Sequence, residues 1–145
     1  MMWKEYLHNI SNECQFESPA TETEIASIKK ELGMDLPNQL EALYNETNGV
    51  SGNYGISFVW STEQVVRENL FLRTLQERQD FMQPVDHFLF FSDAGNGDLF
   101  AYVRENDTTW NENIYVWDHE DDSRRPIAPS IETFLKGWIT GEISV

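Results

Sequence analysis

Apolar residues at the start of the chain recur with the spacing of a helix. Trp3, Leu7 and Ile10 stand at positions i, i+4 and i+7, which places them on one helical face. This pattern predicts a helix over about residues 3–14. A polar linker that contains Pro19 follows it.

Two more helices are predicted before residue 50. Thr21 and Glu24 have the spacing of a capping box, in which a hydroxyl and a carboxylate bond the free N–H groups at a helix start. Gly33 is suited to end this helix, because glycine adopts the left-handed conformation without steric cost. Pro37 opens the next helix, where its missing N–H does not matter, and Gly49 lies at its end.

From about residue 56 the apolar residues no longer recur with the helical period but alternate as in extended strands. Ile56, Phe58 and Trp60 alternate with their neighbours, and the apolar runs that come later are bounded by turn residues. These patterns predict strands at residues 56–60, 88–92, 99–103 and 114–117.

Two helices complete the predicted pattern. A second capping box at Ser61 opens a helix that runs to about Leu75, and the polar residues 76–84 are expected to form an irregular surface stretch. Ser130 can cap a last helix with one apolar face. Helices followed by strands with short turns indicate an α+β fold with antiparallel pairing. We expect one domain over residues 1–145, with a single mostly antiparallel sheet packed by the N-terminal helices and the C-terminal helix.

Charge is the unusual feature of the composition. The 145 residues include 10 Lys and Arg against 25 Asp and Glu, a formal net charge of −15. Such a surface repels phosphate backbones and anionic membranes, so neither nucleic acid nor a membrane is an expected partner. It attracts basic proteins and speeds their capture. The alternative is that the charge serves only solubility.

The cysteine content and the hydropathy of the sequence indicate the cellular compartment. Cys14 is the only cysteine, so no intramolecular disulfide is possible, which fits a reducing compartment. The sequence contains neither the apolar core of a secretory signal nor an apolar run long enough for a membrane span. A cytoplasmic location is therefore expected.

Catalytic and metal-binding motifs are not found in the sequence. The turn that begins at Asp93 carries calcium-loop residue types, but Gly95 falls at the third position and Arg104 at the twelfth, where oxygen ligands are needed. A hairpin turn with positive φ at Gly95 or Gly97 is the better interpretation. No nucleophile motif and no phosphate-binding glycine motif occurs. We expect neither an enzyme nor a bound metal or cofactor.

Acidic and aromatic residues are the candidates for partner binding. The densest acidic cluster, at residues 118–122, is either a solvated loop or a contact patch for a basic partner. Trp110 lies in a polar segment and is expected to be exposed, as a binding hot spot would be, whereas Trp117 is assigned to the core. The predicted partner-binding residues are Trp60, Asp93, Asp98, Trp110, Asp118, Glu120, Asp121 and Asp122.

Several pieces of the sequence occur in an order typical of one family. The first half contributes Glu31-Leu32-Gly33, Leu36-Pro37 and Asn48-Gly49. The second half contributes the turn Asp93–Asp98, the segment Ile114–Glu120, and Ile127–Ser130 followed by Phe134-Leu135. Over about residues 20–137 the chain resembles the SUKH superfamily, whose domains are similar to the yeast cell-wall regulators of the Smi/Knr type.

This resemblance implies an α+β fold with helices packed on a mixed or antiparallel sheet. For bacterial members it implies an immunity protein that binds and blocks a polymorphic toxin, often a nuclease. It supplies no catalytic residues. The hypothesis is therefore a cytoplasmic, non-enzymatic protein, monomeric or weakly dimeric, that neutralises a cognate toxin or binds another basic protein. The alternative is a regulatory or scaffold module of the fungal type.

Overall fold

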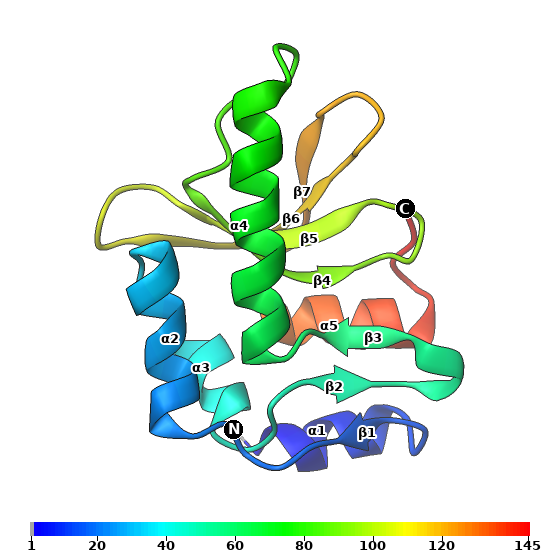
Figure 1. Cartoon of the computed structure of the whole chain (residues 1–145). Helices are drawn as coiled ribbons and strands as arrows, with labels where there is room; N and C mark the ends of the chain where they lie inside the picture. The colour runs from blue at the N-terminus through cyan, green and yellow to red at the C-terminus, as the bar shows by residue number, and fades with distance from the viewer. Residues whose placement is uncertain (1) are drawn as a thin grey trace.

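Two antiparallel sheets form the centre of the molecule (Figure 1). The computed structural model describes residues 2–145. The first sheet has the order β1-β2-β3, formed by Gln15–Phe16, Val50–Ser51 and Ser57–Val59. The second has the order β4-β5-β6-β7, formed by Phe88–Asp93, Leu99–Arg104, Trp110–Trp117 and Arg124–Ala128. The prediction of an α+β fold with antiparallel pairing is confirmed, and the prediction of a single sheet was wrong.

The two sheets meet at Trp60 but do not merge. The Trp60 N–H donates to the Phe91 carbonyl (2.8 Å), which brings the end of β3 beside β4. Ser61 then caps a helix that begins at Thr62, so the chain turns away before further strand pairing can form. A short contact therefore replaces the continuous ladder that the sequence pattern favoured.

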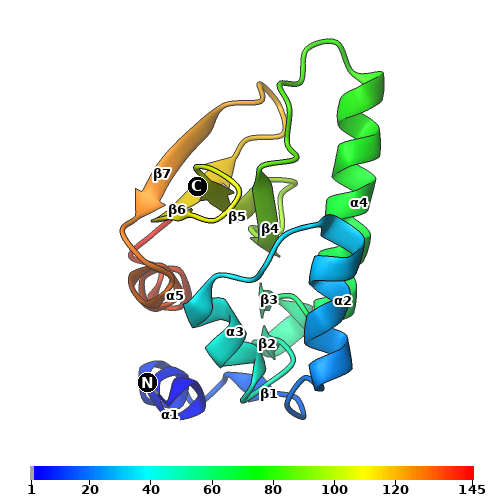
Figure 2. The ribbon, with the colours of Figure 1, turned by 90° about the vertical axis from the view of Figure 1, so that its left-hand side faces the viewer.

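Five helices within residues 2–145 cover these sheets (Figure 2). They are α1 (Trp3–Ile10), α2 (Glu22–Leu32), α3 (Asn38–Tyr44), α4 (Thr62–Arg78) and α5 (Ile131–Thr140), with a short 3₁₀ helix, η1, at Asn53–Gly55. Figure 2 shows α2 and α4 on one side of the strands, with α1 and α5 on the other. None of the helices formed by residues 2–145 has the length and apolar character needed to span a bilayer.

The capping box predicted at Thr21 is confirmed, whereas of the box predicted at Ser61 only the hydrogen bond to the serine hydroxyl is present. The Thr21 hydroxyl accepts from the Glu24 N–H (3.1 Å), and the Glu24 carboxylate accepts from the Thr21 N–H (2.9 Å). Gly33 ends α2 at φ 74°, in the left-handed region. Ser61 and Ser130 each accept a backbone N–H at the start of α4 and α5.

Several predicted boundaries were wrong. The first helix ends at Ile10 rather than near Cys14, and Cys14 is buried in the segment before β1. Helix α4 runs to Arg78, into the stretch expected to be irregular. Strand β6 begins at Trp110 rather than at Ile114, and β7 at Arg124–Ala128 was not predicted. Because β7 lies at the edge of its sheet, it tolerates Pro126, which a central strand would not.

Aromatic side chains fill the space between the second sheet and α5. Phe134 of α5 is fully buried and contacts the rings of Phe91 and Phe100, with centroids 5.8 Å and 4.6 Å away. Trp138 covers the outer side of Phe100 at 4.9 Å. These contacts fix the position of the C-terminal helix beside the loops that form the candidate site.

Candidate protein-binding surface

Three loops are spread along one edge of the molecule in Figure 1, with the β2–β3 loop at the lower right, the β4–β5 turn above it and the β6–β7 loop at the top. They are the β2–β3 loop (residues 52–56), the β4–β5 turn (94–98) and the β6–β7 loop (118–123). The β2–β3 loop and the β4–β5 turn line one groove, and the β4–β5 turn is bonded to the β6–β7 loop through Asp98 and His119. The acidic residues predicted to bind a partner lie mostly on this edge.

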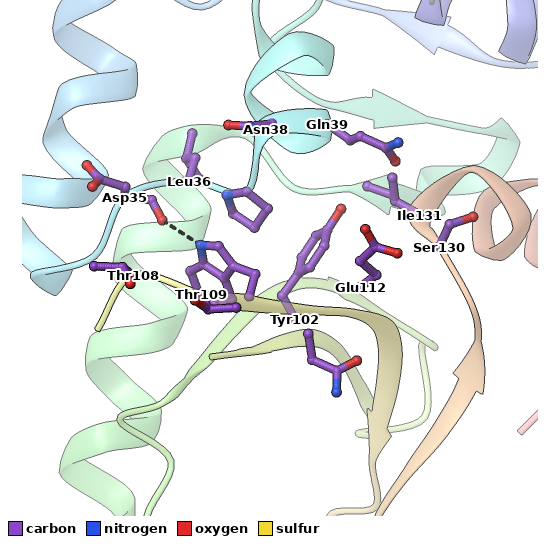
Figure 3. Close-up of a pocket in the computed structure, with 13 residues that line it drawn as sticks. Asp35, Leu36, Asn38, Gln39, Tyr102, Thr108, Thr109, Glu112, Ser130 and Ile131 are labelled. Carbon is purple, nitrogen blue, oxygen red and sulfur yellow. Dashed lines mark hydrogen bonds between the residues drawn. The ribbon is translucent and has the colours of Figure 1, made fainter. Parts of the chain in front are cut away.

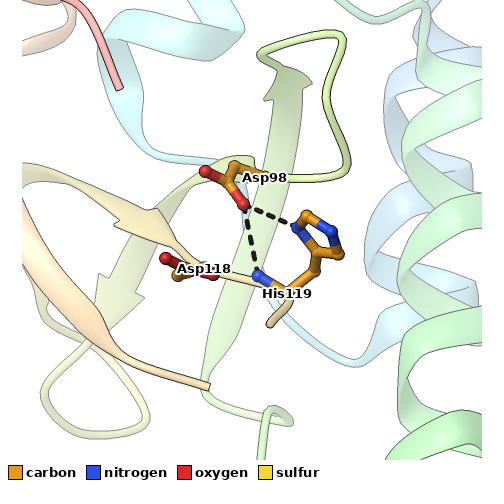
Figure 4. Close-up of side chains that lie close together, drawn as sticks. All are labelled: Asp98, Asp118 and His119. Carbon is orange, nitrogen blue, oxygen red and sulfur yellow. Dashed lines mark hydrogen bonds and ion pairs between the residues drawn. The ribbon is translucent and has the colours of Figure 1, made fainter. Parts of the chain in front are cut away.

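Asp98 is a structural residue that holds the β6–β7 loop in place (Figure 4). Its side chain is 12% exposed, and the carboxylate accepts from the His119 ring at Nδ1 (2.7 Å) and from the His119 backbone N–H (3.3 Å). A Cβ at Gly97 would lie 2.8 Å from the imidazole, and the φ of 102° there also favours glycine. The predicted role of Asp98 as a partner contact is therefore not supported by its position.

Asp98, Asp118 and His119 also have the residue types of a metal site. Their ligand atoms lie within 4.8 Å of one another. His119 Nδ1 and one Asp98 oxygen are already bonded to each other at 2.7 Å. This arrangement accounts for the cluster as a link between two loops.

The His119–Asp98 pair should make stability depend on pH. The hydrogen bond to Asp98 raises the pKa of His119. A raised pKa in the folded state gives stability that is complete below about pH 6.5 and is lost as the pH rises through that pKa. Wild type should therefore exceed His119→Gln in unfolding free energy at about pH 5.5, and the gap should close by about pH 8.5. Urea unfolding across this range measures it, and a gap independent of pH would assign the effect to packing.

Asp122 is bound into the structure rather than free for a partner. Its side chain is 5% exposed and accepts from the Trp117 indole N–H (2.7 Å), the Gln83 backbone N–H (2.8 Å) and Arg124 (3.0 Å). Burial raises the pKa of Asp122, but these hydrogen bonds outweigh burial and lower it. Arg124 in turn lies over the Phe88 ring, 4.8 Å from its centroid. Partners within the chain occupy this carboxylate, so its position does not support the predicted contact role.

Asp118, Glu120 and Asp121 form no ion pair within residues 2–145; Asp118 is half-buried and the other two are exposed. Asp118 accepts the Glu120 N–H (2.8 Å), and Asp121 accepts the Ser123 N–H (2.9 Å), which shapes the loop. The hydrogen bond from Ser123 lowers the pKa of Asp121, so that group stays ionised. Glu120 is exposed. These three carboxylates are the part of the predicted acidic cluster that remains available to a basic partner.

The predicted aromatic contacts are placed differently. Trp60 is 2% exposed, and its indole N–H donates to the Asp93 carboxylate (2.7 Å), so both residues serve to hold β3 against β4. Trp110 is half-buried, because its indole N–H donates to the Asp35 carbonyl (3.2 Å) and its ring meets Tyr102 edge-on. Trp60 is therefore a core residue, and Trp110 belongs to a wall of a separate groove. Trp117 is buried, as predicted.

A groove of mixed polar and apolar lining beside the β4–β5 turn was not predicted. It has a volume of about 700 Å³. Its apolar lining comes from distant parts of the chain: Tyr54, Ile56, Phe58, Ala94, Trp138 and Ile139. Glu13 and Asp93 also line it, and none of its lining residues is Lys or Arg. The groove thus combines apolar contact area with negative charge.

Tyr54 is the most unusual residue of this groove. Its side chain is fully exposed, and its φ of 62° lies in the left-handed region, next to Gly55 at φ 77°. A bulky residue in that region carries strain of about 1 kcal/mol or more. The turn sequence Asn-Tyr-Gly was the only feature of the sequence that indicated an exposed loop here. Ile56 was assigned to the predicted strand, but it is 51% exposed in the structure.

Comparison with known families identifies the fold. The family model described as "SUKH_6: SMI1-KNR4 cell-wall" matches residues 22–135, well over half of the chain. The chain belongs to the SUKH family. Domains of this family generally serve in protein interaction and immunity. No curated protein matches the chain.

The SUKH match covers only part of the candidate surface. Both acidic turns lie within residues 22–135. The groove is completed by residues outside that range: Ser11, Glu13, Trp138 and Ile139. Segments on both sides of the matched range of this SUKH protein therefore contribute to the groove. The family match alone would not have shown the complete groove.

Proposed function

We propose that this SUKH protein is an immunity protein that binds and neutralises a cognate toxin in the cytoplasm, without catalysing a reaction. The family match supports a role in protein interaction. The net charge of −15 supports a basic partner, such as a toxin that binds nucleic acid. Neutralisation would then be occlusion, with the acidic loops covering a basic substrate groove of the toxin.

The observation that carries this proposal is the groove at Tyr54. Protein interfaces combine an apolar, aromatic centre with a polar rim, and Tyr is enriched among residues that contribute most binding energy. The groove has this composition, and the free carboxylates of Asp118, Glu120 and Asp121 lie on the loop linked to it through Asp98. Tyr54 presents its whole side chain to solvent, which leaves it free to insert into a partner.

Replacement of Tyr54 should separate binding from folding. We expect Tyr54→Ala to weaken binding to the toxin about 10-fold, because a fully exposed aromatic anchor is removed. Its unfolding free energy should not fall, since the side chain makes no buried contact. Phe71→Ala is the matched control, because Phe71 is 60% exposed on α4, away from the groove, and should leave affinity unchanged.

The partner itself is tested by co-expression. The protein is co-expressed with the product of the adjacent reading frame, and growth rescue and co-purification are measured. Rescue with co-purification supports the immunity function. If Tyr54→Ala still rescued growth and bound the toxin with unchanged affinity, the interface would lie outside the groove at Tyr54. Capture of a non-toxic partner, with no rescue, would favour the regulatory module instead.

A further inference from the structure

A second groove lies between the α2–α3 linker and the β5–β6 hairpin (Figure 3). Its volume is about 620 Å³. The linker contributes Asp35 to Pro37, the hairpin contributes residues 108–112, and α3 and the start of α5 close its upper side. It shares no lining residue with the groove at Tyr54.

Tyr102 supplies an unsatisfied polar group to this groove. Its side chain is 4% exposed, and Figure 3 shows its hydroxyl pointing between Gln39, Glu112 and Ile131. No side chain or backbone group in residues 2–145 forms a hydrogen bond with this hydroxyl. Burial raises the pKa of Tyr102, so the hydroxyl stays protonated and neutral. The oxygen is not among the buried polar atoms that lack a partner, so it is open to solvent in the groove and can accept from an incoming donor.

Glu112 supplies a negative charge to the second groove. Figure 3 shows its carboxylate on the same side of the groove as the Tyr102 hydroxyl, and it forms no ion pair with residues 2–145. Asp35, the other acid of the lining, is paired with Lys29 at 3.2 Å. The lining contains no Lys or Arg. The groove therefore offers one uncompensated negative charge beside a hydrogen-bond acceptor.

Trp110 gives the groove a fixed aromatic wall. Its indole N–H is held by the Asp35 carbonyl (3.2 Å), and its ring meets Tyr102 edge-on with centroids 6.0 Å apart. The ring is therefore positioned before any ligand arrives. Aromatic faces attract cations, and a guanidinium plane stacks on them better than an ammonium does.

We propose that this groove binds the guanidinium group of an arginine side chain presented by the partner protein. Its N–H groups would donate to the Glu112 carboxylate and to the Tyr102 hydroxyl oxygen, and its plane would lie against Trp110. An anion is disfavoured by Glu112 and by the net charge of −15. A neutral ligand would leave the Glu112 charge uncompensated. The groove thus recognises one basic residue, apart from the broader surface at Tyr54.

This inference rests on the proposed function only for the source of the arginine. The groove itself can be tested with a small probe, the capped tripeptide Gly-Arg-Gly, and with the same peptide carrying citrulline, which keeps the shape and loses the charge. Amide and indole N–H resonances are followed by NMR during titration. We expect the arginine peptide to shift the Trp110 indole N–H and residues 108–112, and the citrulline peptide to shift neither.

Two variants assign the contacts. Glu112→Gln should weaken peptide binding about 10-fold, because it removes a charge-assisted hydrogen bond, and Tyr102→Phe about 3-fold. Tyr102→Phe should keep its fold, since the hydroxyl has no bond to lose. Asp107→Asn removes the same charge from an exposed position on the same hairpin, outside the groove, and should leave binding unchanged.

The outcomes separate this inference from the proposed function. Equal shifts with citrulline, shifts confined to the loop at residues 118–122, or an equal loss in Asp107→Asn would overturn the arginine site. Specific peptide binding with no toxin rescue would keep the site and reject the immunity function. Toxin binding that is unaffected by Glu112→Gln, together with no peptide shifts, would keep the function and reject the site.

Discussion

Replacing Asn69 with Ala should lower the free energy of unfolding by about 3 kcal/mol. Asn69 of α4 is 2% exposed. Its amide donates to the Phe90 carbonyl (2.8 Å) and to the Val65 carbonyl (2.7 Å), and its oxygen accepts from the Phe90 N–H (2.9 Å). Alanine would leave both backbone groups of Phe90 buried and unpaired, at a cost of about 1–3 kcal/mol each. Urea unfolding measures the loss.

The control for this prediction lies on the same helix. Thr74→Ala removes a hydroxyl that bonds only to the Leu70 carbonyl at an exposed position, and it should change stability by less than about 0.5 kcal/mol. If Asn69→Ala lowered the unfolding free energy equally little, water would have to bond the Phe90 backbone groups in place of the Asn69 side chain. Asn69 would then not be the link between α4 and β4. A large loss would establish that α4 is bonded to β4 through one side chain.

Asn69 also explains why the expected single sheet did not form. Beyond the Trp60–Phe91 bond, the free edge of β4 is covered by the Asn69 side chain instead of by a strand. The sequence pattern showed β3, β4, β5 and β6, because alternation is local, but it did not show β1, β2 and β7. It also did not show that a polar residue of a helix would replace strand pairing, since no local pattern connects Asn69 with β4.

Local signals in the sequence were reliable where their cause is local. The Thr21–Glu24 capping box, the end of α2 at Gly33 and the turn glycines Gly95 and Gly97 depend on neighbouring residues, and all are present as predicted. The family motifs likewise led to the family that the match confirms. At these positions prediction succeeded because a few consecutive residues determine the conformation.

The candidate site depended on contacts between distant segments. The groove at Tyr54 combines Glu13, Tyr54 and Trp138, which no periodicity connects. Charge density marked the acidic loop as a candidate, but it could not separate the free carboxylates from Asp98 and Asp122, whose partners come from elsewhere in the chain. Burial and pairing decide which acids are available, and both are properties of the fold.

Neutralising the free carboxylates should slow association with a basic partner more than any other surface change. In the triple variant Asp118→Asn, Glu120→Gln, Asp121→Asn, we expect the association rate constant at low salt to fall about 30-fold. Asparagine keeps the oxygens that accept from Glu120 and Ser123, so the loop should keep its shape. Stopped-flow measurements against the co-purified toxin test the rate.

The salt dependence distinguishes steering from contact loss. Charges at the surface act over about 10 Å at 0.1 M salt and about 30 Å at 0.01 M, so the wild-type rate should fall steeply as salt rises while the triple variant changes little. The control is Glu5→Gln, Glu31→Gln, Glu77→Gln, which changes the net charge equally at exposed sites on α1, α2 and α4. If the control slowed association as much, net charge rather than the acidic loop would steer the partner. If the triple variant instead accelerated dissociation alone, these carboxylates would be direct contacts and the steering role would be wrong.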